Sequence, residues 1–262
     1  MPRGESAEVP TSKAVGFERS GGGGKMAKPA APVEPEPEPK TVLSPLTPPS
    51  PSADRGETVF FFDWDDTLLC TSFLDLHNLV CDDVVQVSSE ISWQLSRIQK
   101  VAVELLREAE EIGHVFIVTN AMEGWVELSA ARWLPELVSA LRNVTIVPMR
   151  ASKGDARYEG EATKWKEQAF IEIVNRFEAE NETGVAQVIA MGDSECEIDA
   201  ARAAGAALDR RPLVKTVKLK PTPSAEELSK ELQVVLQSFR KIAEKPHDLK
   251  ISLERKCAAA TQ

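Results

Sequence analysis

Cysteine and histidine are scarce in this chain, which argues against two common ways of stabilising a fold. The 262 residues include 4 cysteines and 3 histidines. The cysteines form no CxxC pair and have no histidine-rich neighbourhood; they are Cys70, Cys81, Cys196 and Cys257. Neither a disulfide framework nor a structural zinc site is therefore expected, and a reducing, cytoplasmic compartment fits best.

Long apolar runs and clusters of basic residues are also lacking. No apolar stretch approaches the ~20 residues that a transmembrane helix needs, so no membrane span is expected. The formal net charge is −10, and the lysines and arginines are scattered rather than grouped in a stripe. Neither nucleic acid nor an anionic membrane is therefore expected as the main partner. The first residues show neither the apolar core of a secretory signal nor the bias of a transit peptide.

Residues 1–57 differ in composition from the rest of the chain. They contain SGGGGK, PAAPVEPEPEPK, SPLTPPSPS and a single aromatic residue, Phe17. Such a segment cannot bury enough apolar surface to offset its conformational entropy, so we expect a disordered extension. Its Ser-Pro and Thr-Pro pairs could be phosphorylated, and its PxxP spacings could recruit a partner. A plain flexible extension is the simpler interpretation. The remainder divides into a domain at 58–245 and a flexible tail at 246–262.

From residue 58 onward, predicted strands and helices alternate. Short apolar runs that end in polar turns are typical of strands buried on both faces, and each is followed by a stretch with helical spacing. Strands are expected near 59–62, 114–121 and 144–148, within 186–195, and at 213–220 as an edge strand. Helices are expected near 89–112, 123–141 (interrupted by Pro135), 163–180, 197–205 and 224–244. The alternation predicts an α/β, Rossmann-like three-layer sandwich with a central, mainly parallel sheet of about five strands.

Two of the expected helices carry further predictions. Apolar residues at helical spacing in 163–180 indicate its buried side, which is expected to hold Trp165, Ala169, Ile173 and Phe177. The short helix that begins at 197 is expected to end at Gly205, because glycine commonly follows the last turn of a helix.

Three carboxylates follow the first predicted strand almost at once. The stretch VFFFDWDDT places Asp63, Asp65 and Asp66 behind four apolar residues. Repulsion and desolvation disfavour such a cluster unless a positive charge lies beside it. Thr119 and Asp193 follow two other strands in the same way. Because the carboxyl ends of parallel strands share one edge of the sheet, these residues are expected to form one site. Oxygen ligands without His or Cys indicate Mg²⁺ there.

These motifs together resemble the haloacid dehalogenase-type (HAD-like) phosphohydrolases. The resemblance rests on DWDDT at 63–67, Thr119 after an apolar strand, a lysine that opens a helix, and GDSECE at 192–197, in this order. It covers roughly residues 58–220. It implies that Asp63 is a nucleophile that forms an aspartyl-phosphate, and that Asp65 acts first as general acid and then as general base.

The resemblance also implies the metal ligands. The carboxylates of Asp63 and Asp193 and the backbone carbonyl of Asp65 would hold Mg²⁺, with Glu197 in the outer shell. The cation would neutralise the clustered carboxylates against an incoming phosphate.

By the same resemblance, Thr119 and one lysine would bind the phosphoryl group, and Asn120 is expected among the substrate-binding residues. Which lysine does so stays open at this point. Lys153, Lys164 and Lys166 all lie between the third and fourth strands. Lys166, in the Trp-Lys pair at the start of a helix, fits best, and Lys164 is the alternate.

Ordinary structural roles are expected for other residues of these motifs. Asp66 is expected to serve a turn or a helix start, Asp199 to lie on a helix surface and Trp64 to pack in the core. The ordinary alternative for the carboxylate cluster as a whole is a metal-free helix cap. It would account for the polar residues at the end of one strand but not for those at the ends of three strands.

The expected function is therefore a Mg²⁺-dependent phosphoric monoester hydrolase. By resemblance, dehalogenases lack an acid at the position of Asp65, and ion-pumping ATPases carry Lys-Thr after the nucleophile. The stretches available for insertion are too short for a substantial cap, and capless members accept bulky substrates, including phosphoproteins. A phosphotransferase or mutase would need such a cap.

The alternative outside the enzymes is a non-catalytic scaffold that recruits partners through the Pro-rich tail. The intact set of aspartates argues against this alternative.

Overall fold

The first strand is apolar on both faces because helices cover both faces of the sheet. The computed structural model describes residues 56–80, 87–150 and 162–253. In strand β1 (Glu57–Phe62), Phe60 stacks on Phe239 of helix α7 (Ala225–Glu244), with ring centroids 5.3 Å apart. Its neighbour Phe61 points to the opposite face and stacks on Phe170 of helix α5 (Ala162–Glu180) at 3.9 Å.

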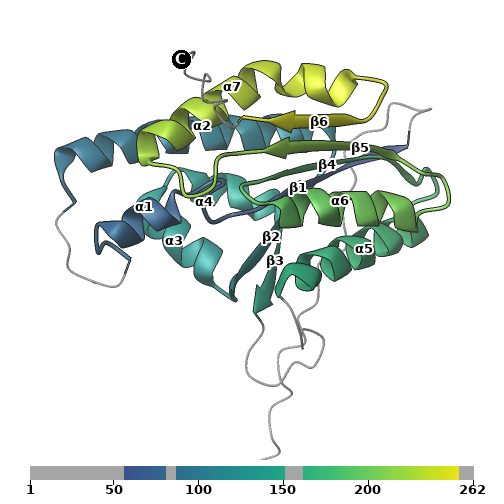
Figure 1. The fold of residues 1–262 in the computed structure, drawn as a ribbon, viewed down its shortest axis with the longest axis horizontal. Coiled ribbons are helices and arrows are strands. Elements are labelled where there is room, and N and C mark those ends of the chain that lie inside the picture. Colours follow the sequence, from purple (N-terminus) through teal and green to yellow (C-terminus); the bar gives the residue numbers. More distant parts are fainter. Residues whose placement is uncertain (1–55, 81–86, 151–161, 254–262) are drawn as a thin grey trace, which may run out of the picture. The chain divides into compact units, whose positions relative to one another are not determined.

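The sheet has six parallel strands in the order β3-β2-β1-β4-β5-β6 (Figure 1). The other strands are β2 (His114–Met122), β3 (Thr145–Arg150), β4 (Val185–Gly192), β5 (Leu213–Lys218) and β6 (Leu249–Ser252). The predicted α/β, Rossmann-like class is confirmed. The chain builds outward from β1 to one edge and from β4 to the other, so the strand order reverses between β1 and β4. Parallel sheets bind ligands at the carboxyl side of such a switch point.

Helices form a layer on each face of the sheet (Figure 1). Helices α2 (Ser89–Ile112) and α7 contact each other on one face, and α5 contacts α6 (Glu195–Ala207) on the other. The short helices α1 (Thr71–Leu76), α3 (Trp125–Trp133) and α4 (Leu137–Ala140), with a 3-10 turn at Leu141–Asn143, lie in the segments that follow β1 and β2. The predicted interruption at Pro135 separates α3 from α4.

The last edge of the sheet differs from the prediction. Strand β5 is not an edge strand, because β6 pairs with it from Lys215↔Leu249 to Lys218↔Ser252. These β6 residues lie inside 246–262, which was predicted to be a tail. Only alternate residues of this short strand are partly buried, so it lacks the apolar run that marks the other strands.

Two predictions about helices were wrong in detail. Helix α6 continues through Gly205 to Ala207. A Cβ on Gly205 would lie 2.4 Å from Val214 Cγ2, so this glycine allows close packing on β5 rather than ending the helix. The buried face of α5 is turned by about one position from the predicted face. It holds Lys166, Ala169, Phe170, Val174 and Phe177, whereas Trp165 and Ile173 are partly exposed.

Several predictions fall outside the described residues. They concern the N-terminal extension up to residue 55, Lys153, and the end of the tail from 254.

Strand β1 begins at Glu57, one residue before the predicted boundary of the domain. The described residues all belong to one compact unit. Among them, no helix is both long and apolar enough to cross a membrane.

Candidate active site

Three neighbouring strands bring polar residues to the same edge of the sheet. Strand β1 lies between β2 and β4, with Phe62 opposite Ile117 on one side and Met191 on the other. Asp63 follows β1 directly, and its backbone N–H donates to the carbonyl of Met191 at 3.0 Å. Thr119 lies two residues beyond Ile117, and Asp193 follows the end of β4. The parallel register thus gathers residues that are far apart in the sequence.

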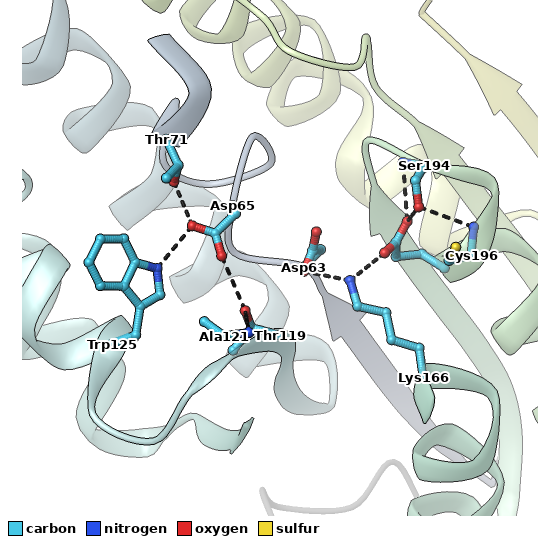
Figure 2. Close-up of polar contacts among 10 residues, drawn as sticks. Asp63, Asp65, Thr71, Thr119, Ala121, Trp125, Lys166, Ser194 and Cys196 are labelled. Carbon is cyan, nitrogen blue, oxygen red and sulfur yellow. Dashed lines mark hydrogen bonds and ion pairs between the residues drawn. The ribbon is translucent and has the colours of Figure 1, made fainter. Parts of the chain in front are cut away.

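A buried lysine from the helical layer completes this edge. Lys166 lies near the start of α5 and is 2% exposed. Its Nζ lies 2.7 Å from Oδ1 of Asp63 and also donates to Oε1 of Glu197 (Figure 2). Lys164, the alternate, is exposed on the same helix. Of the lysines that the structure describes in this region, Lys166 is therefore the one that it pairs with Asp63.

Glu197 fixes that lysine and caps a helix at the same time. It is the third residue of α6, and its Oε2 accepts hydrogen bonds from the backbone N–H of Ser194 at 3.1 Å and from Ser194 Oγ at 2.6 Å. Its other oxygen, Oε1, holds Lys166. A Cβ on Gly192 would lie 2.3 Å from Glu197 Cγ, so glycine at this position leaves room for the glutamate. Glu197, which was expected in the outer shell of the metal, contacts Lys166 directly.

Among the described residues that these contacts join at this edge, carboxylates outnumber cations. Asp63, Asp193 and Glu197 supply three carboxylates, and Lys166 supplies one ammonium group. Burial raises the pKa of Asp63 to about 7, since the opposing effect of Lys166 is partly offset by Glu197 and Asp193. Burial also raises the pKa of Asp193 to about 6, with further contributions from Glu197 and Asp66. For Lys166, burial lowers the pKa, but Asp63 and Glu197 outweigh burial and hold it above its ordinary value.

Asp65 points away from Lys166 toward a separate group of hydrogen-bond donors (Figure 2). Its Oδ1 accepts from Thr71 Oγ1 at 2.6 Å and from Trp125 Nε1 at 2.9 Å. Its Oδ2 accepts from Thr119 Oγ1 at 3.3 Å. Thr119 Oγ1 in turn accepts from the backbone N–H of Ala121 at 3.1 Å. Asp65 and Thr119, two of the residues predicted for the site, are thus in direct contact.

The remaining residues of the motifs lie in the following places. Asp66 adopts a positive φ of 56° in a turn, and its carboxylate accepts from the backbone N–H of Ser72 at 2.9 Å and from Ser72 Oγ. Trp64 is fully buried, and its Nε1 donates to Ser129 Oγ at 2.9 Å. Asp199 is exposed and pairs with Arg202 on the surface of α6. Asn120, predicted to bind substrate, is exposed near the end of β2.

The chemistry of the donor groups fits a magnesium ion. Asp63 and Asp193 follow neighbouring strands, and Mg²⁺ is typically held by one or two carboxylates together with water and phosphate oxygens. Within 56–80, 87–150 and 162–253, no three side chains of His, Cys, Asp or Glu are grouped as metal ligands. The predicted set needs only two carboxylates and the carbonyl of Asp65.

Thr71 and Trp125 are the contacts of this edge that the sequence did not reveal. Both are the first residues of short helices, α1 and α3. Neither belongs to a periodic apolar pattern that would have marked it. The only local signal is Gly124, which precedes Trp125 and adopts a left-handed φ of 82°. A glycine just after a polar strand end is typical of a sharp turn back toward the site.

Comparisons with known proteins give little beyond a fold-level likeness. No protein-family model matches the chain, and no curated protein matches it. Among solved structures it is similar to the HAD domain of the effector protein Lem4 from Legionella pneumophila, with 14% identity over 72% of this chain and 99% of that one, and a TM-score of 0.36. An inactive mutant of the same domain matches with 13% identity over 72% and 98% of the two chains and a TM-score of 0.35.

Proposed function

We propose that this protein is a Mg²⁺-dependent phosphatase that hydrolyses phosphate monoesters through an aspartyl-phosphate on Asp63. The observation that supports this most strongly is the buried pair between Lys166 Nζ and Asp63 Oδ1, 2.7 Å apart at the switch point of a parallel sheet. Burying ionic groups is costly unless they are paired. Here one lysine faces two carboxylates, with Asp193 close by, and an added divalent cation would balance the remaining negative charge.

In the first step, an oxygen of Asp63 attacks phosphorus and the bond from phosphorus to the ester oxygen breaks. Asp65 donates its proton to the departing oxygen, so the alcohol leaves neutral. In the second step, Asp65 removes a proton from water, and the resulting hydroxide attacks phosphorus. The bond to Asp63 breaks, inorganic phosphate is released and the Asp63 carboxylate is restored. Lys166 and Thr119 would contact phosphoryl oxygens throughout and stabilise the charge that develops there.

Asp63, Asp193 and the carbonyl of Asp65 would hold the magnesium ion. When bound, it supplies positive charge that lowers the repulsion between Asp63 and the phosphate dianion. Asn120, which is exposed near the end of β2, would contact the substrate outside the phosphoryl group. We propose a bulky phosphorylated substrate, such as a phosphoprotein, because the connecting segments are too short for a substantial cap domain.

Magnesium is expected to be required for activity and to stabilise the protein. Hydrolysis of an aryl phosphate by the wild type should stop when EDTA is added and return with excess MgCl₂. If the metal binds the folded protein only, ligand at 100 times its dissociation constant adds about 2.7 kcal/mol to the free energy of unfolding. The measurements are steady-state rates and thermal melts at several Mg²⁺ concentrations.

Asp193→Asn and Asp199→Asn are the matched pair for this test. Asp193→Asn should lose both the magnesium-dependent rate and the magnesium-dependent rise in Tm. Asp199→Asn changes an exposed aspartate on α6 and should retain both. Hydrolysis that persists undiminished in EDTA, or an Asp193→Asn protein that behaves as wild type, would contradict the proposed metal site.

A further inference from the structure

Asp65 is held by three donors that come from three different elements. Thr71 belongs to α1, Thr119 to β2 and Trp125 to α3. Two of these donors share Oδ1, at 2.6 and 2.9 Å, whereas Oδ2 receives the longest of the three contacts, 3.3 Å from Thr119. A carboxylate oxygen has two lone pairs, so Oδ1 is fully occupied and Oδ2 is not. The two oxygens of Asp65 are therefore in different environments (Figure 2).

The three donors also differ in what they can do when Asp65 is protonated. The hydroxyls of Thr71 and Thr119 can rotate and accept a hydrogen bond instead of donating one. The indole N–H of Trp125 can only donate. A proton on Oδ1 would oppose the hydrogen of Trp125 or require Thr71 to turn away, whereas a proton on Oδ2 disturbs only the weak contact with Thr119.

Trp125 is itself anchored to the segment that carries Asp65. Ser129 Oγ donates to the carbonyl of Trp125 at 2.6 Å, and the same oxygen accepts from Nε1 of Trp64 at 2.9 Å. Trp64 directly precedes Asp65 and is fully buried. One serine therefore connects the start of α3 to the chain beside Asp65. This connection restrains the backbone at Trp125 relative to the segment that carries Asp65.

We propose that Trp125 is a positioning residue that, together with Thr71, keeps Oδ1 of Asp65 as an acceptor and so assigns the transferred proton to Oδ2. Oδ2 is the oxygen on the side of Thr119, the residue expected to bind the phosphoryl group. When Thr119 turns its hydroxyl toward a phosphoryl oxygen, Oδ2 becomes available to protonate the departing ester oxygen. The proposal rests on the proposed phosphatase activity and adds to it the residue that orients the acid.

Two esters with different leaving groups distinguish a loss of orientation of the general acid from a loss of activity that has another cause. An alkyl phosphate needs a proton on its departing oxygen, whereas dinitrophenyl phosphate releases a stable phenolate that needs none. The value of kcat/KM reports the first phosphoryl transfer for each ester. General acid catalysis contributes roughly 10²–10⁴-fold, and a displacement of about 1 Å can cost roughly 10²-fold. Trp125→Phe should therefore lower kcat/KM for the alkyl ester roughly 10–100-fold and that for the dinitrophenyl ester by less than about 3-fold.

The variants for this experiment include their own controls. Asp65→Asn should show the same dependence on leaving group with a larger loss, which calibrates the test. Thr71→Val should follow Trp125→Phe to a smaller extent because it also removes a donor from Oδ1, and Thr71→Ser should restore the rate. If the Trp125→Phe protein fails to fold, the Thr71 pair decides the question. Trp93→Phe, at an exposed tryptophan on α2, should leave both esters unaffected.

Two outcomes would overturn the proposal while the phosphatase activity stands. One is an equal loss on both esters in Trp125→Phe, which would assign the tryptophan a purely structural role. The other is unchanged kinetics on both esters in Trp125→Phe while Asp65→Asn discriminates between them. A wild-type protein that hydrolyses neither ester in the presence of Mg²⁺ would instead overturn the proposed function itself.

Discussion

Substitution of Asp63 by asparagine is expected to abolish ester hydrolysis and to leave the fold intact. The amide is a neutral, poor nucleophile, so the covalent route is lost, and loss of a catalytic nucleophile lowers kcat by roughly 10⁴-fold or more. The amide oxygen can still accept a hydrogen bond from Lys166, which keeps its contact with Glu197. In metal-free protein the substitution also removes a carboxylate whose ionisation is opposed by burial. The Tm without magnesium should therefore be unchanged or higher.

The measurement for this prediction is the magnesium-dependent rate on an aryl phosphate, with thermal melts as the test of folding. The matched control is Asp199→Asn, which makes the same chemical change on the surface of α6 and should keep the wild-type rate. A folded Asp63→Asn protein that retains more than about one hundredth of the wild-type rate would show that the nucleophile lies elsewhere.

Replacement of Lys166 by methionine is expected to have the largest effect on stability. Lys166, Asp63 and Glu197 have side chains that are 2%, 8% and 3% exposed. Removing the lysine leaves two buried carboxylates facing each other. Breaking a buried pair in this way typically costs about 3–5 kcal/mol in the free energy of unfolding. The phosphoryl contact is lost as well, so Lys166→Met should be inactive even at temperatures where it is folded. Chemical denaturation of the wild type and the variant measures the difference.

A double variant tests whether that loss comes from the orphaned charges. Lys166→Met combined with Glu197→Gln removes one of the two carboxylates, so its free energy of unfolding should exceed that expected from adding the two single effects. Lys164→Met changes an exposed lysine on the same helix and should alter stability by less than about 0.5 kcal/mol. This prediction would be contradicted if the two single effects simply add and Lys166→Met lowers the free energy of unfolding no more than Lys164→Met does. The buried charge cluster would then not stabilise the fold.

The strand ends could be predicted from the sequence because their signals are local. Four apolar residues before Asp63, and similar runs before Thr119 and Asp193, mark buried parallel strands, and parallel register brings their ends together. Strand β6 could not be found in this way. It has four residues, only alternate ones are partly buried, and its place beside β5 depends on a pairing across helix α7.

Lys166 and Trp125 differ in how clearly the sequence marks them as parts of the site. Lys166 lies on the same face of α5 as Ala169 and Phe170, and that spacing could have indicated its burial if the face had been assigned one position later. Trp125 and Thr71 carried no comparable pattern. Gly124 marks a turn before Trp125, but the contacts of both residues with Asp65 depend on how α1 and α3 pack beside the end of β1, which is a tertiary feature.

The measurement that tests the central claim most directly is chemical trapping of the phosphorylated protein. Wild-type protein is mixed with Mg²⁺ and a rapidly hydrolysed aryl phosphate, quenched in acid during turnover and reduced with borohydride, which converts an aspartyl-phosphate to homoserine. Peptide mass spectrometry should find homoserine at position 63, dependent on substrate and magnesium and absent from Asp63→Asn. Turnover accompanied by modification at another residue, or by none in the wild type, would contradict the assignment of Asp63 as the nucleophile.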